Sequence, residues 1–275
     1  MKKLNLTITT IIILTITAFI FQSCNNDEPK TLTVDSFAKY GEIHNNFLTN
    51  IKNNFDFNKD LKNNQEKVEY INDFNKEFVN TLDLPLNEKN IMLEGFDSHK
   101  SIVKTENLTN LLLPKNKDND KNLFELIDEL KNNPAISTNS INILNILASN
   151  LKNGYENHLP NSELKIVVLD LIDNYNNYGY DLNSGEGVMI GTILSISISS
   201  INWWEENPEA AIGGEKLFPW LAADVAGAVV GAVISAGVQQ AVVGEINWTV
   251  VAGGAVVAAI ASSTGVVGRI AKWLL

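Results

Sequence analysis

The sequence predicts an all-α protein: a bundle of short helices followed by a C-terminal helical hairpin rich in Gly, Ala and Val. Two observations support this prediction. Apolar residues recur at helical spacing through the middle of the chain. The C-terminal part contains two long stretches without a charged side chain. Sustained alternation, the pattern of a half-buried strand, does not characterise the middle.

The first predicted helix begins near Asp35 or Ser36, either of which can cap it. A second apolar stripe follows and ends before Pro85, a normal stop signal. The first stripe comprises Phe37, Tyr40, His44, Phe47, Ile51 and Phe55, and the second comprises Val68, Ile71, Phe74, Phe78 and Leu82. A lone histidine on such a stripe is typical of a core residue, so we expect His44 to be buried rather than to act as a ligand.

Further helices are predicted over residues 98–113, 121–132, 139–153 and 162–178, the last two closing on Gly154 and Gly179. This makes five to seven short helices before the tail. Residues 187–204 lack charge and, at about 1.5 Å per residue, would span about 27 Å, just short of the ~30 Å hydrocarbon layer. We therefore expect a buried central helix there. A strand is the alternative, because Leu194, Ile196 and Ile198 alternate with serines.

The N-terminus has the features of an export signal. Two lysines follow Met1, and an apolar run extends from Leu4 to Phe21. The only cysteine of the chain, Cys24, comes directly after Ser23 at the end of this run. The acidic stretch 25–28 and Pro29 then favour a flexible tether. An ordinary signal peptide with a chance cysteine is the alternative interpretation.

The sequence Phe21-Gln22-Ser23-Cys24 resembles a bacterial lipobox of the looser Bacteroidota type. The resemblance implies cleavage after Ser23 and attachment of diacylglycerol and palmitate-like acyl chains to Cys24. Several acyl chains hold a protein durably to a membrane, since each buried methylene contributes about 0.8 kcal/mol. The expected address is therefore the cell envelope, at the outer membrane or cell surface, with membrane lipid as partner through acylated Cys24.

Composition argues against several classes of protein. The chain has 21 basic and 32 acidic side chains, and the single arginine Arg269 offers no basic cluster, so no nucleic-acid partner is expected. One cysteine and three scattered histidines predict no zinc site. Residues 56–60 and 118–122 imitate the start of a calcium loop, but Leu61 and Leu123 replace the required glycine. We expect no cofactor, no metal and no catalytic group.

The tail contains two uncharged stretches, Val225–Gly244 and Ile246–Gly268, each long enough to cross a bilayer. Small residues repeat four apart along both, which lets helix backbones approach closely. The predicted packing residues are Gly227, Gly231, Gly254 and Ala258, and the predicted membrane-interface residues are Trp220, Trp248 and Trp273. The tail resembles glycine-zipper segments of bacteriocin-like, membrane-active peptides, which implies membrane insertion without a catalytic group.

An alternative is equally open, because Ala and Gly contribute little to insertion, and Asp224 and the pair Gln239-Gln240 oppose it. The tail would then pack as a hairpin on the body. Around Gly41 and His44 the body resembles uncharacterised secreted proteins of the Bacteroidota type, which implies no known chemistry. The expected organisation is a signal peptide (1–23), a tether (24–34), an acidic helical domain (35–208) and the hairpin (209–275).

Two functions follow from these alternatives. In the first, a lipid-anchored envelope protein uses its glycine-zipper hairpin to associate with a membrane or a partner helix, and a chain lacking residues 219–275 stays folded. In the second, the acidic body is a surface-exposed, non-enzymatic binding module, the tail completes its core, and the same deletion unfolds it.

Overall fold

The computed structural model describes residues 32–56, 58–98, 123–132, 134, 136–157, 160–180, 184–210, 223–232, 235 and 248–266. These residues are 85% helical and include no strand, which confirms the all-α prediction. Residues Leu32–Leu275 form one compact unit. The boundary expected at residue 208 therefore separates two sequence compositions that share one folded unit. Cys24 and the signal segment lie outside the described residues.

The folded unit begins earlier than the expected end of the tether. Leu32 and Val34 are buried, and the Leu32 amide donates a hydrogen bond to the carbonyl of Tyr180. A 3-10 helix, η1 (Val34–Phe37), leads directly into α2 (Ala38–Asn54). The whole first apolar stripe is buried, including His44. The expected first helix is thus present.

The second stripe lies on α3 (Asn64–Thr81), whose start is capped because the Asn63 side chain accepts a hydrogen bond from the Glu66 amide. The next helix, α4 (Leu86–Ser98), was not predicted. Helix α3 already ends at Thr81, and Pro85 instead begins the next helix, since its carbonyl accepts from the Lys89 amide. The helix expected over residues 98–113 lies outside the described residues, apart from Ser98.

Three helices follow with bounds close to those expected: α6 (Leu123–Leu130), α7 (Thr138–Asn157) and α8 (Asn161–Tyr178). Gly179 has a φ of 76°, the left-handed conformation that ends α8 as predicted. The predicted end of α7 at Gly154 is wrong, because the helix continues to Asn157. Gly154 is buried. A single helical glycine costs only about 1 kcal/mol, which core packing can offset.

The uncharged segment after Ser184 forms α9 (Gly185–Glu206), followed by the short 3-10 helix η2 (Pro208–Ala210). The strand alternative for residues 194–199 is therefore wrong. Residues 189–197 are all buried, so both faces of α9 contact other parts of the protein, as expected for a central helix. The serines that alternate with isoleucine can be buried because their hydroxyls are hydrogen-bonded: Ser195 donates to the Phe37 carbonyl and Ser197 to the Ile193 carbonyl.

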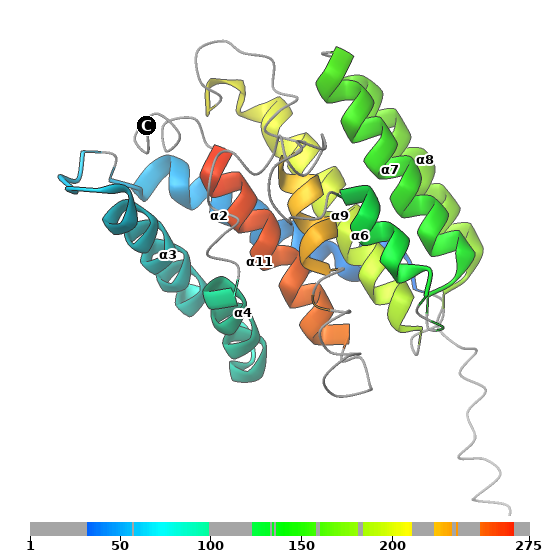
Figure 1. The fold of residues 1–275 in the computed structure, drawn as a ribbon, viewed down its shortest axis with the longest axis horizontal. Helices are drawn as coiled ribbons and strands as arrows, with labels where there is room; N and C mark the ends of the chain where they lie inside the picture. Colours follow the sequence, from blue (N-terminus) through cyan, green and yellow to red (C-terminus); the bar gives the residue numbers. More distant parts are fainter. Residues whose placement is uncertain are drawn as a thin grey trace, which may run out of the picture. The chain divides into compact units, whose positions relative to one another are not determined.

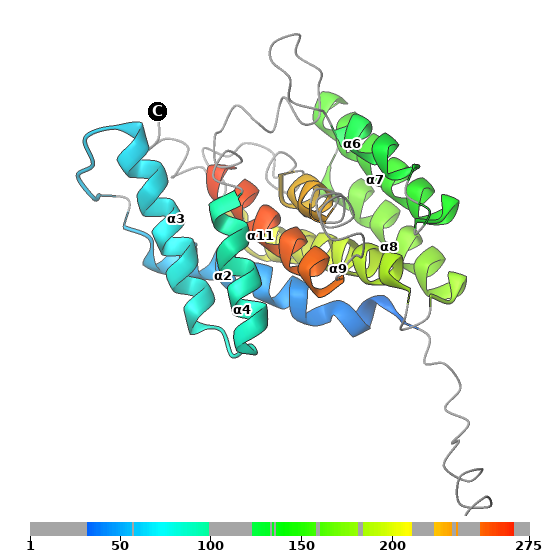
Figure 2. The same ribbon diagram turned by 60° about the horizontal axis from the view of Figure 1, so that its bottom comes forward.

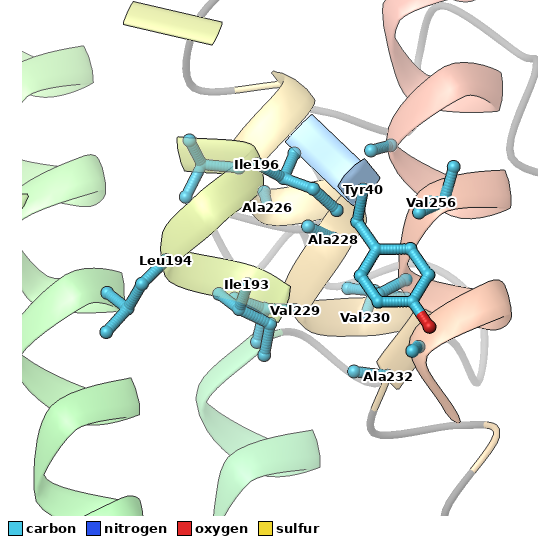
Figure 3. Packing of buried hydrophobic residues seen from close by; sticks show 14 of the residues in the cluster. Tyr40, Ile193, Leu194, Ile196, Ala226, Ala228, Val229, Val230, Ala232 and Val256 are labelled. Carbon is cyan, nitrogen blue, oxygen red and sulfur yellow. The ribbon is translucent and has the colours of Figure 1, made fainter. Parts of the chain in front are cut away.

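The tail forms the helical segment Ala223–Ala232 and α11 (Trp248–Val266), which together we call the hairpin. Helix α11 contacts α4, α9 and α2, while α9 also contacts α2 and α8 (Figures 1 and 2). Figure 3 shows Val230 and Ala232 of the hairpin beside Tyr40 and Val256. The hairpin and α9 thus form the centre of the core, and the more polar helices cover it.

Candidate functional site: the buried hairpin and its aspartate

The two helices of the hairpin approach each other through glycine. A Cβ atom added to Gly231 would lie 2.2 Å from the Gly254 carbonyl oxygen and 2.5 Å from the Ala258 Cβ. A Cβ added to Gly254 would lie 2.0 Å from the Ser235 Oγ. Gly231 lies against Gly254 and Ala258, whereas Ser235, one turn later, lies against Gly254 alone. Moving forward along one helix therefore means moving backward along the other, so the two helices run antiparallel. Backbones this close require the small residues that the sequence supplies.

The hairpin has almost no solvent-exposed face among its described residues. All residues from 223 to 232 and from 251 to 260 are buried. On its outer side α11 meets α4, where a Cβ at Gly253 would lie 2.9 Å from the Ile91 Cγ2. A helix that is apolar on every side is stable only when it is enclosed by protein or lipid. Here protein encloses it.

One charged side chain of the hairpin, Asp224, is completely buried. Its Oδ2 accepts hydrogen bonds from the Ser200 Oγ and, at 2.7 Å, from the Trp204 Nε1. The His44 Nε2 lies 3.7 Å from the same oxygen. We call His44, Ser200, Trp204 and Asp224 the Asp224 cluster. It joins α2, α9 and the hairpin at one carboxylate.

Local structure explains why these side chains meet. Ser200 and Trp204 are four residues apart and so lie on one face of α9. Asp224 directly follows Ala223, the first described residue of its helix. His44 belongs to the buried stripe of α2. A buried carboxylate would be costly without such donors.

The cluster contains Ser, His and Asp, but its geometry differs from that of a hydrolytic triad. In a triad the imidazole lies between the serine and the carboxylate. Here the Ser200 hydroxyl donates directly to the carboxylate of Asp224. The cluster is also closed off from solvent, since each of its four residues is 0% exposed. The arrangement can hold the hairpin in place, and in this conformation it gives a substrate no access.

Helix α2 is fastened along α9 by further polar contacts. The Ser195 Oγ donates to the Phe37 carbonyl at 2.9 Å, and the Asn45 Nδ2 donates to the Ser199 carbonyl at 2.9 Å. Between them a Cβ at Gly41 would lie 2.1 Å from the Ser199 Oγ, so glycine is needed for this close approach. These contacts make α2 the helix that closes the core over α9.

A second, partly buried network joins α9 to α7 at the opposite end of α9. The Glu186 Oε2 accepts from the Ser140 Oγ at 2.7 Å and from the Ser137 amide at 2.6 Å, at the start of α7. The Tyr180 hydroxyl lies 2.8 Å from the Ser140 Oγ. Burial raises the pKa of Tyr180 and also that of Tyr175, whose hydroxyl donates to the Gly187 carbonyl at 2.8 Å. This network contains no hairpin residue.

The structure places the predicted residues as follows. Gly231, Gly254 and Ala258 lie at the contact between the two hairpin helices, and Gly227 is buried in the first of them. Trp248 is the first residue of α11, while Trp220, Trp273 and Cys24 lie outside the described residues. In the sequence alone, Asp224 is only an obstacle to membrane insertion. An isolated acidic residue at the start of an apolar helix was the available signal for a buried partner.

Metal binding is not indicated within the part of the chain that the structure describes, which contains no group of three or more His, Cys, Asp or Glu side chains suited to a metal ion. In the loop 56–60, the Asp56 side chain instead accepts from the Asn58 amide at 2.9 Å, as in an Asx turn. The second calcium-like segment, 118–122, lies outside the described residues.

Comparison with known proteins gives no match: no family model, no curated protein and no solved structure is similar to the chain.

Proposed function

We propose that this protein is a lipid-anchored component of the cell envelope that stores an apolar helical hairpin inside its helical body and delivers it to a membrane. Two observations support this proposal: the burial of hairpin residues 223–232 and 251–260, and the lipobox-like cysteine Cys24 in the sequence. A segment with no polar face suits two surroundings, a protein core and a bilayer. Acyl chains attached at Cys24 would keep the hairpin close to the bilayer.

Delivery requires that the hairpin leave the core, and the Asp224 cluster controls this step. A hydrogen bond to a charged group contributes about 1.5–3 kcal/mol, and Asp224 accepts two from α9. These bonds hold the first hairpin helix against α9. Weakening them lowers the cost of opening the core, so less free energy separates the stored hairpin from the inserted one.

The test compares two variants that each weaken a charge-assisted hydrogen bond made by α9. Asp224→Asn retains the size of the side chain and removes its charge next to Ser200 and Trp204. Ser140→Ala removes a buried donor to Glu186 in the network that lacks hairpin residues. Both variants also carry Cys24→Ala, so that acyl chains do not supply membrane binding. Flotation with vesicles of zwitterionic phospholipid measures the bound fraction.

Urea unfolding first gives the free energy of unfolding of each variant, and the two are compared under conditions in which these values are equal. We then expect the vesicle-bound fraction of Asp224→Asn to be several-fold larger than that of Ser140→Ala. Equal binding by the two variants would show that the Asp224 cluster has only a structural role. No binding by either variant would contradict membrane delivery. The anchor is tested separately: cells fed a palmitate analogue should label the native chain, and Cys24→Ala should abolish the label.

A second candidate function, the binding module, is favoured by one observation. Apolar side chains of α7 and α8 are exposed to solvent, with Ile166 61% and Leu169 44% exposed. These two lie three apart on α8 and so share a face. The binding module predicts that the chain floats with vesicles in neither of the variants above, so the same experiment separates the two functions.

A further inference from the structure

We infer that α4 is a movable cover over α11, which swings away while the rest of the folded unit stays intact and leaves an opening through which the hairpin exits. The exit rests on the proposed function, whereas the opening of α4 does not depend on it. Helix α4 contacts α11 and α3. In both views α3 and α4 lie side by side on one side of α11, and α7 and α8 lie on the other (Figures 1 and 2).

Helix α4 buries fewer side chains than the other helix that lies against the hairpin and α9. Within its residues 86–94, Met92 is buried, Ile91 and Leu93 are partly buried, and Leu86 is exposed. In α2, by contrast, seven residues are buried. The free energy that holds a helix on a core grows with the apolar surface that it buries. Separating α4 from the core therefore costs less than separating α2.

Two polar contacts of α4 with its neighbours lie at the surface. The Glu88 carboxylate forms an ion pair with Lys39 of α2, at 3.2 Å between Oε2 and Nζ. The Lys89 Nζ donates to the Asn80 carbonyl of α3 at 3.1 Å. Contacts of this kind contribute little, because water competes for the same groups and screens their charges. They can be exchanged for water when α4 moves, unlike the buried hydrogen bonds between α2 and α9.

A buried amide on α3 lowers the cost of opening further. Asn75 is completely buried, and neither its Nδ2 nor its Oδ1 has a hydrogen-bond partner in the part of the chain that the structure describes. Helix α3 itself is held on α2 by aromatic contacts, with ring centroids 5.3 Å apart for Phe78 and Phe47 and 5.1 Å for Phe74 and Phe55. Its other neighbours are α4 and α11. Movement of α4 admits water beside α3, and an unpaired buried amide gains free energy when water binds it.

The cover and the Asp224 cluster act on different helices of the hairpin. Asp224 belongs to the first helix and accepts two hydrogen bonds from α9. The cover lies against the second helix, α11, with Ile91 beside Gly253. Release of the hairpin therefore requires that the Asp224 bonds weaken and that α4 opens. Because α3 stays on α2, the hinge is the loop 82–85 that joins α3 to α4.

Thiol labelling measures the opening of α4 without a membrane. In the Cys24→Ala chain, Met92→Cys on α4 and Leu171→Cys on α8 each place one thiol at a buried position, 3% and 4% exposed in the native chain. A maleimide modifies such a thiol only when it becomes exposed, and urea unfolding gives the rate that global unfolding alone allows. We expect Met92→Cys to react at least about tenfold faster than that rate, and Leu171→Cys to match it. Equal protection of the two thiols, relative to global unfolding, would overturn the inference.

A matched pair of substitutions tests the contribution of Asn75. Asn75→Leu on α3 and Thr192→Val on α9 each remove a buried polar group that has no hydrogen-bond partner among the described residues. Both should therefore raise the free energy of unfolding in urea. We expect Asn75→Leu to slow the labelling of Met92→Cys several-fold and Thr192→Val to leave it unchanged. Equal labelling rates in the two variants would contradict the role of Asn75 in the opening.

A disulfide between α4 and α11 tests whether the hairpin leaves past the cover. The Cβ of Ile91 and a Cβ added to Gly253 lie 4.0 Å apart, within the range of about 3.5–4.5 Å that a disulfide requires. Ile91→Cys and Gly253→Cys are introduced together into the chain that carries Cys24→Ala and Asp224→Asn. Flotation with zwitterionic vesicles then compares the oxidised and reduced forms, at urea concentrations that give both the same free energy of unfolding. We expect the oxidised form to bind several-fold less than the reduced form.

The outcomes of the vesicle experiment separate this inference from the proposed function. Equal binding by the oxidised and reduced forms would show that the hairpin leaves without displacing α4, which would overturn the exit while membrane delivery stands. Absence of binding by the reduced form and by the Asp224→Asn parent would contradict membrane delivery itself. Thiol labelling would then still decide whether α4 opens.

Discussion

Two antiparallel helix pairs of this protein solve the same packing problem in opposite ways. The pair α7 and α8 packs large side chains such as Leu147 and Leu171 inward and exposes Asn, Asp and Glu, together with a few apolar side chains such as Ile166. The hairpin packs backbone against backbone at Gly231 and Gly254, and its residues 223–232 and 251–260 are all buried. Large side chains hold the first pair together, whereas the second pair is held together by backbone contact at glycine residues.

This difference shows what each pair depends on. A helix pair with one polar face can lie at the surface of a protein, because water solvates that face. A pair without one needs enclosure by α2, α4 and α9, or by lipid. The hairpin is therefore both the least self-sufficient part of the fold and the part that could exchange its protein surroundings for a membrane.

The largest expected effect comes from deleting residues 219–275. The deletion removes the buried hairpin and uncovers apolar faces of α2, α4 and α9. The net stability of a domain is only about 5–15 kcal/mol, so we expect loss of cooperative unfolding and aggregation. Circular dichroism with urea and size-exclusion chromatography measure this. Unfolding was the outcome expected of the binding module. Because the hairpin is buried in the core, we expect it of the membrane-delivery function as well.

The matched control is deletion of residues 1–31, which lie before the compact unit. We expect that shortened chain to unfold cooperatively, with a midpoint close to that of the mature protein. A soluble monomer with cooperative unfolding after deletion of 219–275 would show instead that the hairpin is dispensable for the body.

The sequence was sufficient for the parts of the fold that depend on local pattern. Helical spacing predicted α2, α3, α6, α7 and α8, and lack of charge predicted the buried helix α9. The sequence does not indicate α4, because the apolar positions of that helix form no clear stripe and Pro85 is a normal stop signal. Gly154 does not end α7, because core packing is stronger than the low helix propensity of one glycine.

The Asp224 cluster could not be predicted in the same way. His44, Ser200 and Asp224 come from three separate segments, and only the tertiary fold brings their side chains together. The sequence showed that His44 lies on an apolar stripe and that Asp224 interrupts an apolar region. It did not show that these two irregularities compensate each other, because pairing across long separations leaves no periodic signal.

The next prediction tests whether added atoms disrupt one pair and removed atoms the other. In Gly231→Ala the new methyl group meets the Gly254 carbonyl and Ala258. We expect a loss of about 1–3 kcal/mol from overpacking, although alanine favours a helix by about 1 kcal/mol. In Leu147→Ala on α7 we expect a loss of about 2–5 kcal/mol from the cavity. Urea unfolding measures both.

Asn142→Ala, at an exposed position of α7, is the control for helix propensity alone. It should leave the free energy of unfolding unchanged or raise it slightly, by under about 1 kcal/mol. If Gly231→Ala also stabilised the protein, the close backbone contact between the hairpin helices would be wrong.

The smallest expected effect depends on pH and concerns the side of α9 away from the hairpin. Burial raises the pKa of Tyr175 and Tyr180, whose rings stack with centroids 4.7 Å apart. An unfolded phenol loses its proton near pH ~10, while the folded one keeps it. Because the unfolded state then binds fewer protons, stability is complete below pH ~10 and falls above it.

Tyr175→Phe separates the two contributions of this side chain. At neutral pH it removes the hydrogen bond to the Gly187 carbonyl, which should cost about 1 kcal/mol. Above pH ~10 it removes one group whose deprotonation favours unfolding, so the variant should lose stability less steeply than the native chain. Urea unfolding at both pH values measures the two slopes. Equal slopes would mean that Tyr175 ionises as readily in the fold as in the unfolded chain, and the tight junction between α8 and α9 would then be wrong.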